Sequence, residues 1–260
     1  MTQTEWENEM CIKILDLIEN ELYIDFRYLD VAISTLILTP KESLRSTATD
    51  GISLFFPPEQ ILRVFRSNPL FLNRAVLHSV FHCIFRHLWI RGNRDSDLWN
   101  LSCDIAVEWI IDSFDKKSVK RALSGIRTNI YNDFEKQNIP VTAANIYHYL
   151  LSDVTENPDR LNQLTMEFFT DDHRFWPKDP SRSPSAAKAG QSWDKISRRM
   201  EQELNLRGDH TASGAEAIKA QIKEGKSRRS YKDFLRKFTV LQEELHCDYD
   251  EFDLNYYSYG

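Results

Sequence analysis

The longest apolar pattern in the chain lies between Asn68 and Gly92. Its apolar residues fall on every side of a helix: Leu70, Leu72, Val76, Leu77, Val80, Phe81, Ile84, Phe85, Leu88 and Trp89. A helix that is apolar all round is normally buried by its neighbours. Pro69 suits the first helical position, and Gly92 suits the residue after the last one. The pattern therefore predicts one central, buried helix of about 23 residues, roughly 35 Å long.

The segments before this helix predict two further helices and two short strands. Residues 4–29 carry apolar residues at helical spacing among acidic ones, which predicts an amphipathic helix. Residues 31–38 and 52–56 are short, rich in β-branched or aromatic residues and followed by proline, which predicts buried strands. A short helix at 59–66 leads to the central one.

A second apolar helix is predicted at 98–114, directly after a short charged turn. Polar residues recur at every fourth position in it: Asn100, Asp104, Glu108 and Asp112. Such a stripe is typical of the solvated face of a half-buried helix. The short connection also favours packing back onto the central helix, which would turn Asp104 or Glu108 towards it.

The rest of the chain predicts a helical protein with one break in composition. Further helices are expected at 142–151, 159–169, 192–206, 213–224 and 230–245. Residues 177–191 are rich in Pro, Ser, Ala and Lys, the composition of a flexible linker. We therefore expect an α+β, mostly helical domain over 1–176 with a small sheet packed on the central helix. A linker over 177–191 and a helical extension over 192–260, leading towards a further C-terminal domain, would follow.

Composition and charge limit the function classes. The 260 residues are 42% hydrophobic and 28% charged, as in an ordinary globular protein. The net charge of -6 argues against a general nucleic-acid or anionic-membrane binder. The acidic N-terminus is unlike a signal peptide, and no apolar run approaches twenty residues. The four cysteines, Cys11, Cys83, Cys103 and Cys247, form no close pair, which favours reduced thiols in a cytoplasmic protein.

The central helix carries the candidate chemistry. His78 and His82 are four residues apart and differ by about 40° around the helix, so both imidazoles lie on one face. That spacing is the ligand half of the H-E-x-x-H metallopeptidase helix, in which the glutamate serves as general base. Ser79 stands at the glutamate position, where it is a small spacer rather than a nucleophile. The alternative is that both histidines are core residues hydrogen-bonded to backbone.

Three residues compete for the place of a third ligand. Asp104 and Glu108 lie on the following helix, where related zinc sites take their third ligand. His87 lies about 140° from His82, so it ligates only if the helix breaks first. His173 is interpreted as a loop histidine beside aromatic residues.

Three segments of the sequence together resemble a known family. They are Thr49-Asp50-Gly51 with Phe55-Phe56-Pro57, then Leu77-His78 with His82 and His87, and then Asn93-Arg94-Asp95 with Leu98-Trp99-Asn100-Leu101-Ser102-Cys103-Asp104. They resemble a bacterial zincin-like metallopeptidase domain that precedes a von Willebrand factor A-like domain. Weaker similarity extends to 145–150, 172–176 and 231–236.

The resemblance implies a zincin-like fold with a zinc ion held by His78, His82 and Asp104. It also implies a following von Willebrand factor A-like domain and a partner of the MoxR-type AAA+ ATPase class. The family's base is missing because Ser79 replaces the glutamate. Loss of such a base typically costs 10²–10⁴ in rate.

We therefore expect a degenerate metallopeptidase-like domain that binds metal, is catalytically weak or inactive, and acts as a binding or assembly module. One alternative is an active zinc-dependent peptidase that uses Glu108 or another carboxylate as its base. A second alternative is a metal-free structural domain.

Overall fold

The computed structural model describes residues 2–153, 158–206 and 214–227. The predicted helix at 230–245 and Cys247 lie outside these residues. The first half of the chain contains α1 (Gln3–Asp25), η1 (Arg27–Leu29), α2 (Asp30–Ile33), β1 (Ile37–Pro40), β2 (Ala48–Thr49), β3 (Ser53–Phe56), α3 (Pro58–Ser67), α4 (Pro69–Ile84), α5 (His87–Ile90) and α6 (Ser96–Ser113). The second half contains α7 (Gly125–Lys136), α8 (Ala143–Asp153), α9 (Pro158–Phe168), η2 (His173–Phe175), η3 (Pro180–Arg182), α10 (Pro184–Leu206) and α11 (Ala215–Ser227).

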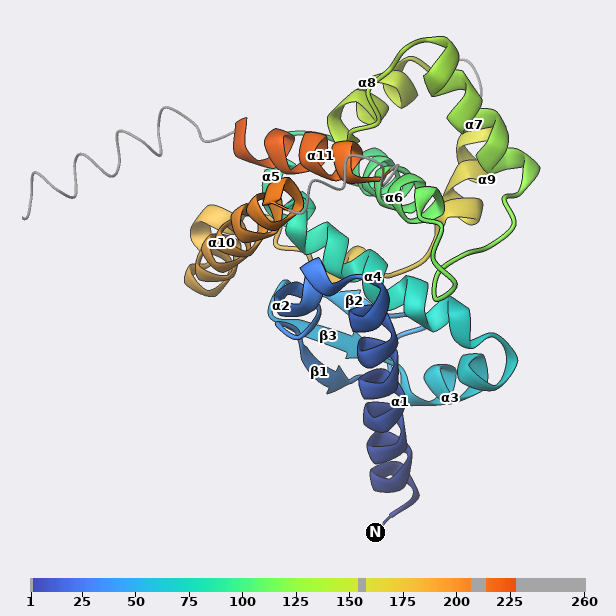
Figure 1. Ribbon diagram of the computed structural model, residues 1–260, viewed down its shortest axis with the longest axis vertical. Helices are drawn as coiled ribbons and strands as arrows, with labels where there is room; N and C mark the ends of the chain where they lie inside the picture. The colour runs from blue at the N-terminus through green and yellow to red at the C-terminus, as the bar shows by residue number, and fades with distance from the viewer. Residues whose placement is uncertain (1, 154–157, 207–213, 228–260) are drawn as a thin grey trace, which may run out of the picture. The chain divides into compact units, whose positions relative to one another are not determined.

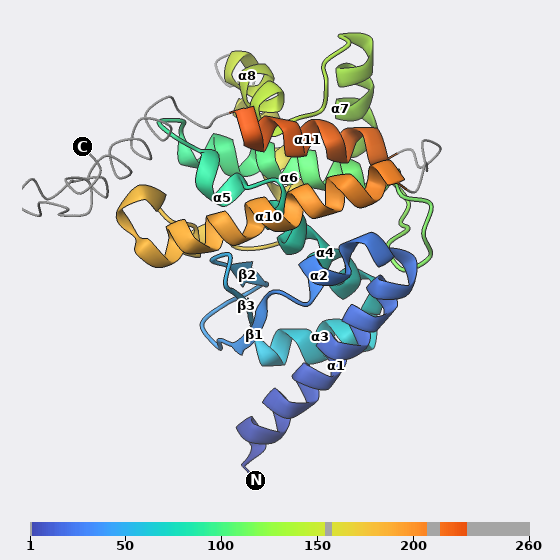
Figure 2. The same cartoon turned by 60° about the vertical axis from the view of Figure 1, so that its left-hand side comes forward.

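Helix α4 is the central element, as the apolar pattern predicts. Helices α1, α2, α3, α6 and α10 all contact it. Figures 1 and 2 show α4 between the sheet, with α1 and α3, on one side and α6 on the other. The structure is therefore mostly helical with a small sheet beside the central helix, which confirms the α+β prediction at this level.

The sheet has three strands in the order β1-β3-β2, with β1 parallel and β2 antiparallel to β3. The predicted strand at 52–56 is confirmed as β3. The predicted strand at 31–38 is wrong over most of its length, because residues 30–33 form α2 and the strand begins only at Ile37. The side chain of Ile37, on the edge strand β1, is also exposed rather than buried. The β-branched run predicted a buried strand, but α2 packs on α4 instead.

The predicted continuous helix at 69–91 is interrupted after Ile84. Arg86 has a φ of 64°, in the left-handed region that ends a helix, and α5 starts at the next residue. Contacts from distant segments accompany the interruption. The Ser197 hydroxyl of α10 donates to the carbonyl of Ile84 at 2.6 Å, and the Trp89 indole donates to the carbonyl of Ala186 at 2.9 Å.

The predicted flexible linker at 177–191 is wrong for residues 184–191, which form the first turns of α10. Ala186, Ala189 and Gly190 are buried there. A Cβ atom at Gly190 would lie 3.1 Å from the Trp89 ring, so small residues let the helix approach that side chain. The small-residue composition therefore reflects close packing rather than flexibility.

Helix α6 is enclosed on both sides. Its residues contribute to two apolar clusters, one shared with α4 and one shared with α8 and α9. The polar stripe is consequently not a solvated face: Asp104 and Glu108 are buried, and only 2% of the Asp112 side chain is exposed. No helix in the described part of the chain is long and apolar enough to cross a membrane.

Candidate metal centre

Two histidines of α4 and one aspartate of α6 meet where these helices pack together. The Nε2 atoms of His78 and His82 are 2.8 Å apart. Asp104 Oδ1 lies 3.3 Å from Nε2 of His78 and 3.2 Å from Nε2 of His82. All three side chains are buried. The three residues that the sequence analysis selected as metal ligands are therefore brought together around one point.

The segment after α9 adds two further side chains at this point, Asp171 from the loop and His173 from the start of η2. His173 Nε2 lies 3.1 Å from Asp104 Oδ1 and 2.8 Å from Asp171 Oδ1. Asp171 Oδ1 lies 3.5 Å from Nε2 of His78. The sequence analysis interpreted His173 as an ordinary loop histidine and did not select Asp171. The signal available for both was the unusual density of acidic and aromatic residues around His173.

The sheet and a tryptophan position this loop. The backbone N–H of Asp172 donates to the carbonyl of Thr47 at 2.8 Å, so the loop continues the edge of β2. The Trp176 ring lies against His173, with the ring centroids 3.9 Å apart. A backbone contact with the distant Thr47 and a ring contact with the nearby Trp176 therefore position Asp171 and His173.

The side chains of His78, His82, Asp104, Asp171 and His173 form one group, which we call the His/Asp cluster. Each offers one ligand atom, and these five atoms all lie within 4.8 Å of one another. Asp171 Oδ1 and His173 Nε2 are buried without a hydrogen-bond partner among the described residues, although they approach each other closely. Unsatisfied buried polar atoms are costly. Ligand atoms that face a common centre, rather than one another, fit a bound cation.

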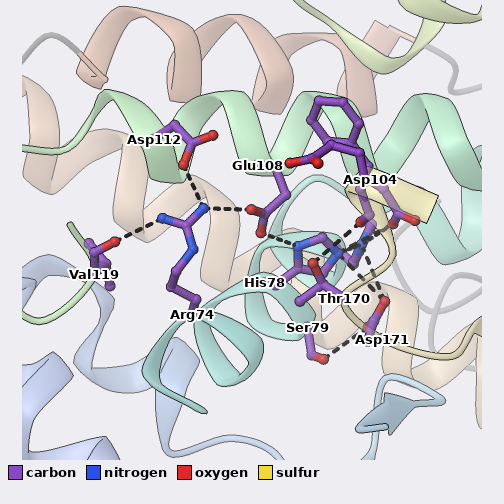
Figure 3. A network of polar contacts seen from close by, with 12 residues as sticks. Arg74, His78, Ser79, Asp104, Glu108, Asp112, Val119, Thr170 and Asp171 are labelled. Atoms are coloured by element: carbon purple, nitrogen blue, oxygen red, sulfur yellow. Dashed lines mark hydrogen bonds and ion pairs between the residues drawn. The ribbon is translucent and has the colours of Figure 1, made fainter. Parts of the chain in front are cut away.

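Glu108 lies on the opposite side of the His78 ring from the cluster. Its Oε1 is 2.9 Å from Nδ1 of His78, as Figure 3 shows. Because an ionised carboxylate only accepts hydrogen bonds, Nδ1–H of His78 is the donor, and Nε2 is the nitrogen that would carry the lone pair when the ring binds a metal as neutral imidazole. Histidines that bind metals usually donate their other N–H to a carboxylate in this way. Glu108 thus does not face the point that the ligand atoms surround.

Two buried arginines hold Glu108 in place. Its Oε2 accepts hydrogen bonds from Arg74 at 2.5 Å and from Arg127 at 2.7 Å. Asp112 accepts from the same two guanidinium groups at 2.7 and 2.8 Å (Figure 3 draws its bond to Arg74). Burial would raise the pKa of Glu108, but His78 and the two arginines outweigh it and hold that pKa well below its usual range. Glu108 is therefore an ionised partner of His78.

His87 occupies the corresponding place behind His82. The interruption at Arg86 brings the Nδ1 atoms of His82 and His87 to 3.0 Å from each other. Burial, together with a smaller contribution from neighbouring histidines, lowers the pKa of His82 to about 4 and that of His87 well below its usual range. Both rings are therefore neutral, and a donor Nδ1–H on His82 leaves its Nε2 lone pair towards the cluster. His87 lies outside the cluster itself.

Ser79 contacts the cluster from α4. Its hydroxyl donates to Asp171 Oδ2 at 2.9 Å, which leaves Oδ1 of that carboxylate directed at the histidines (Figure 3). The residue predicted to be a small spacer therefore binds a member of the cluster.

The electrostatics of the cluster match a doubly charged cation. Burial opposes protonation of His78 and His173, but the nearby carboxylates outweigh it and raise their pKa values to about 9 and about 10. The same contacts hold the pKa of Asp171 at about 2, against the opposing effect of burial. Two carboxylates thus favour two positive charges, which either two imidazolium protons or one divalent ion supplies.

The donor set also suits a transition-metal ion. Three imidazole nitrogens with two carboxylate oxygens are typical ligands of zinc, iron and manganese in proteins. The residues present therefore fit the zinc ion that the resemblance implies.

Comparisons of the chain with models of protein families, with curated proteins and with solved structures found no match.

Proposed function

We propose that this chain is a zincin-like metal-binding domain that has lost efficient peptidase chemistry and acts as a binding or assembly module. The observation that supports it best is the His/Asp cluster, in which ligand atoms from two helices and one loop lie within 4.8 Å of one another. His78, His82, Asp104 and His173 would hold the ion. The ion would supply Lewis acidity and connect three segments that are distant in sequence.

Three features support weak or absent catalysis. The residue after the first histidine is Ser79, whose hydroxyl cannot serve as a general base near neutral pH. Glu108, the other carboxylate considered as a base, contacts Nδ1 of His78 and two arginines instead. Four members of the cluster are also buried and only 6% of the His173 side chain is exposed, whereas a catalytic zinc keeps an open position for water and substrate.

The partners proposed here rest on the resemblance alone. A following von Willebrand factor A-like domain and an ATPase of the MoxR type would give an assembly role to a domain without efficient hydrolysis. A cytoplasmic location agrees with the buried, unpaired thiols of Cys11, Cys83 and Cys103.

Two measurements on the purified chain test the proposal. Elemental analysis after purification without chelators should find one divalent transition-metal ion per chain, and a His82→Gln, Asp104→Asn double variant should hold none. Casein should remain uncut at enzyme concentrations at which a zinc peptidase of ordinary activity digests it.

Two results would contradict the proposal. Metal-free wild type that also fails to take up zinc would favour the purely structural alternative. Casein cleavage that a chelator abolishes would favour the active peptidase.

A further inference from the structure

The structure assigns Asp171 as a fifth protein ligand of the same ion, with Ser79 as the residue that positions it. This inference rests on the proposed function, because it concerns how the metal centre is completed. Its consequence is that the protein supplies all but one of the ligands of a six-coordinate ion.

Asp171 is the member of the cluster with the clearest unfilled bonding capacity. Its Oδ2 accepts a hydrogen bond from the Ser79 hydroxyl, while its Oδ1 is buried and has no hydrogen-bond partner in the described part of the chain. Oδ1 nevertheless lies 2.8 Å from Nε2 of His173 and 3.5 Å from Nε2 of His78. A carboxylate with one oxygen held by a hydrogen bond and the other facing three imidazole rings is positioned to bind a cation.

The spacing of the ligand atoms fits more than four ligands. A tetrahedral zinc ion, with bonds of about 2.0–2.1 Å, holds all its ligands about 3.3 Å apart. An octahedral ion with bonds of about 2.1 Å places adjacent ligands about 3.0 Å apart and opposite ones about 4.2 Å apart. The cluster contains both classes of distance: His173 Nε2 is 2.8 Å from Asp171 Oδ1, whereas His82 Nε2 is 3.9 Å from the same oxygen.

The serine explains why Asp171 presents this oxygen. Ser79 is one residue beyond His78 on α4, so its hydroxyl comes from the same rigid helix as two of the ligands. Its hydrogen bond fixes the rotation of the carboxylate, as partners of metal ligands commonly do. Ser79 is thus a positioning residue and does not touch the ion.

Five protein ligands leave at most one position for an external group in a six-coordinate ion. A zinc peptidase needs room for both an attacking water and the substrate carbonyl. The inferred coordination therefore favours an ion that holds the fold together, or that binds one small ligand, over an ion that hydrolyses peptides. The donor set also suits ions that accept five or six ligands, such as manganese or ferrous iron.

Cobalt(II) provides the test, because its visible absorption depends on coordination number. Tetrahedral cobalt absorbs strongly, whereas five- and six-coordinate cobalt absorbs weakly. We expect weak bands for the cobalt-loaded wild type and clearly stronger bands for Asp171→Ala, whose ion would keep four protein ligands. If Asp171→Ala does not fold, Asp171→Asn should change the spectrum in the same direction, since an amide is a poorer ligand.

Ser79→Ala should weaken cobalt affinity by about 10-fold or more, because Asp171 loses the hydrogen bond that orients it. The matched control is Ser197→Ala, which also removes a buried hydroxyl, bonded to the carbonyls of Ile84 and Trp193 outside the cluster. Its cobalt affinity and spectrum should equal those of the wild type.

A strong tetrahedral spectrum in the wild type that Asp171→Ala leaves unchanged would overturn this inference, while the proposed function would stand. Equal cobalt affinities for Ser79→Ala and wild type would overturn the role of Ser79. A wild type that binds no cobalt at all would overturn this inference and the proposed function together.

Discussion

At the scale of single residues, the chemistry depends on which ring nitrogen of each histidine faces the cluster. Glu108 contacts Nδ1 of His78, and His87 contacts Nδ1 of His82. Both Nε2 atoms are consequently free to face the same point. A pair of histidines at helical spacing becomes a candidate metal site only because each ring has a partner behind it.

Glu108→Gln should lower metal affinity by about 10–100-fold, because His78 loses the carboxylate that fixes its ring and makes it more basic. The matched control is Asp112→Asn. Asp112 accepts from Arg74 and Arg127, as Glu108 does, but does not touch His78. Zinc competition with a chromophoric chelator measures both affinities.

Both variants should lose about 3 kcal/mol of stability, since each removes a charge from the same buried network. Only Glu108→Gln should lose metal affinity as well. Equal affinities for the two variants would show that the contact between Glu108 and His78 does not matter for binding.

Cys11, Cys83 and Cys103 should resist alkylation in the folded protein. Burial raises the pKa of Cys11 to about 11 and those of Cys83 and Cys103 further, so the reactive thiolate is scarce at neutral pH. Iodoacetamide labelling followed by peptide mass spectrometry should show modification at these positions only after unfolding. Rapid labelling of the native protein would contradict the burial of these side chains.

At the scale of elements, the turn between β2 and β3 packs closely against Trp89 of α5. Gly51 has a φ of 85°, and a Cβ atom there would lie 2.6 Å from the Trp89 ring. Its carbonyl also accepts a hydrogen bond from the Trp193 indole at 2.7 Å. The turn therefore connects the sheet with α5 and with α10.

Gly51→Ala should be more destabilising than Gly92→Ala, and the pair separates two effects. Gly92 also has a positive φ, of 63°, but a Cβ atom there meets nothing within 4 Å. Gly92→Ala should cost only the backbone strain, about 1–2 kcal/mol. Gly51→Ala should add about 1–3 kcal/mol for the clash with Trp89. Chemical denaturation measures the free energy of unfolding of both variants. Equal losses would show that the Trp89 side chain moves aside without an energetic penalty.

At the scale of the whole molecule, the His/Asp cluster ties α4, α6 and the loop at 171–173 together. Other contacts of that segment include a backbone hydrogen bond to Thr47, the Ser79 hydrogen bond to Asp171 and the packing of Trp176. An ion bound to all three segments would stabilise the folded state by an amount that grows with the logarithm of the free ion concentration above its dissociation constant.

Zinc at about 100 times its dissociation constant should add about 2.7 kcal/mol to the stability of the wild type. A chelator should reverse this gain and speed amide hydrogen exchange at residues 171–173. Thermal melts with zinc and with chelator, together with exchange measured by mass spectrometry, provide the check. His173→Gln should show a much smaller difference between the two conditions. An identical melting temperature with and without zinc in the wild type would contradict a stabilising ion.

The local pattern of the sequence determined the elements with strong periodicity. The central apolar helix, the amphipathic N-terminal helix, the helix with the polar stripe and the strand at 53–56 were all predictable, because each follows from the spacing of side chains along one segment. The same spacing placed His78 and His82 on one face and identified Asp104 as a candidate ligand.

The predictions were wrong where contacts with distant segments decide the local structure. Residues 31–33 are helical, and residues 184–191 form the start of α10.

Only the tertiary structure decided how the candidate site is completed. Asp171 and His173 join it because β2 holds their loop, Ser79 matters because that loop reaches α4, and Glu108 is buried because α6 is covered on both sides. None of these contacts is local, so the spacing of residues along one segment does not predict them. The sequence determined which side chains one helix presents, whereas packing determined which of them meet side chains from elsewhere.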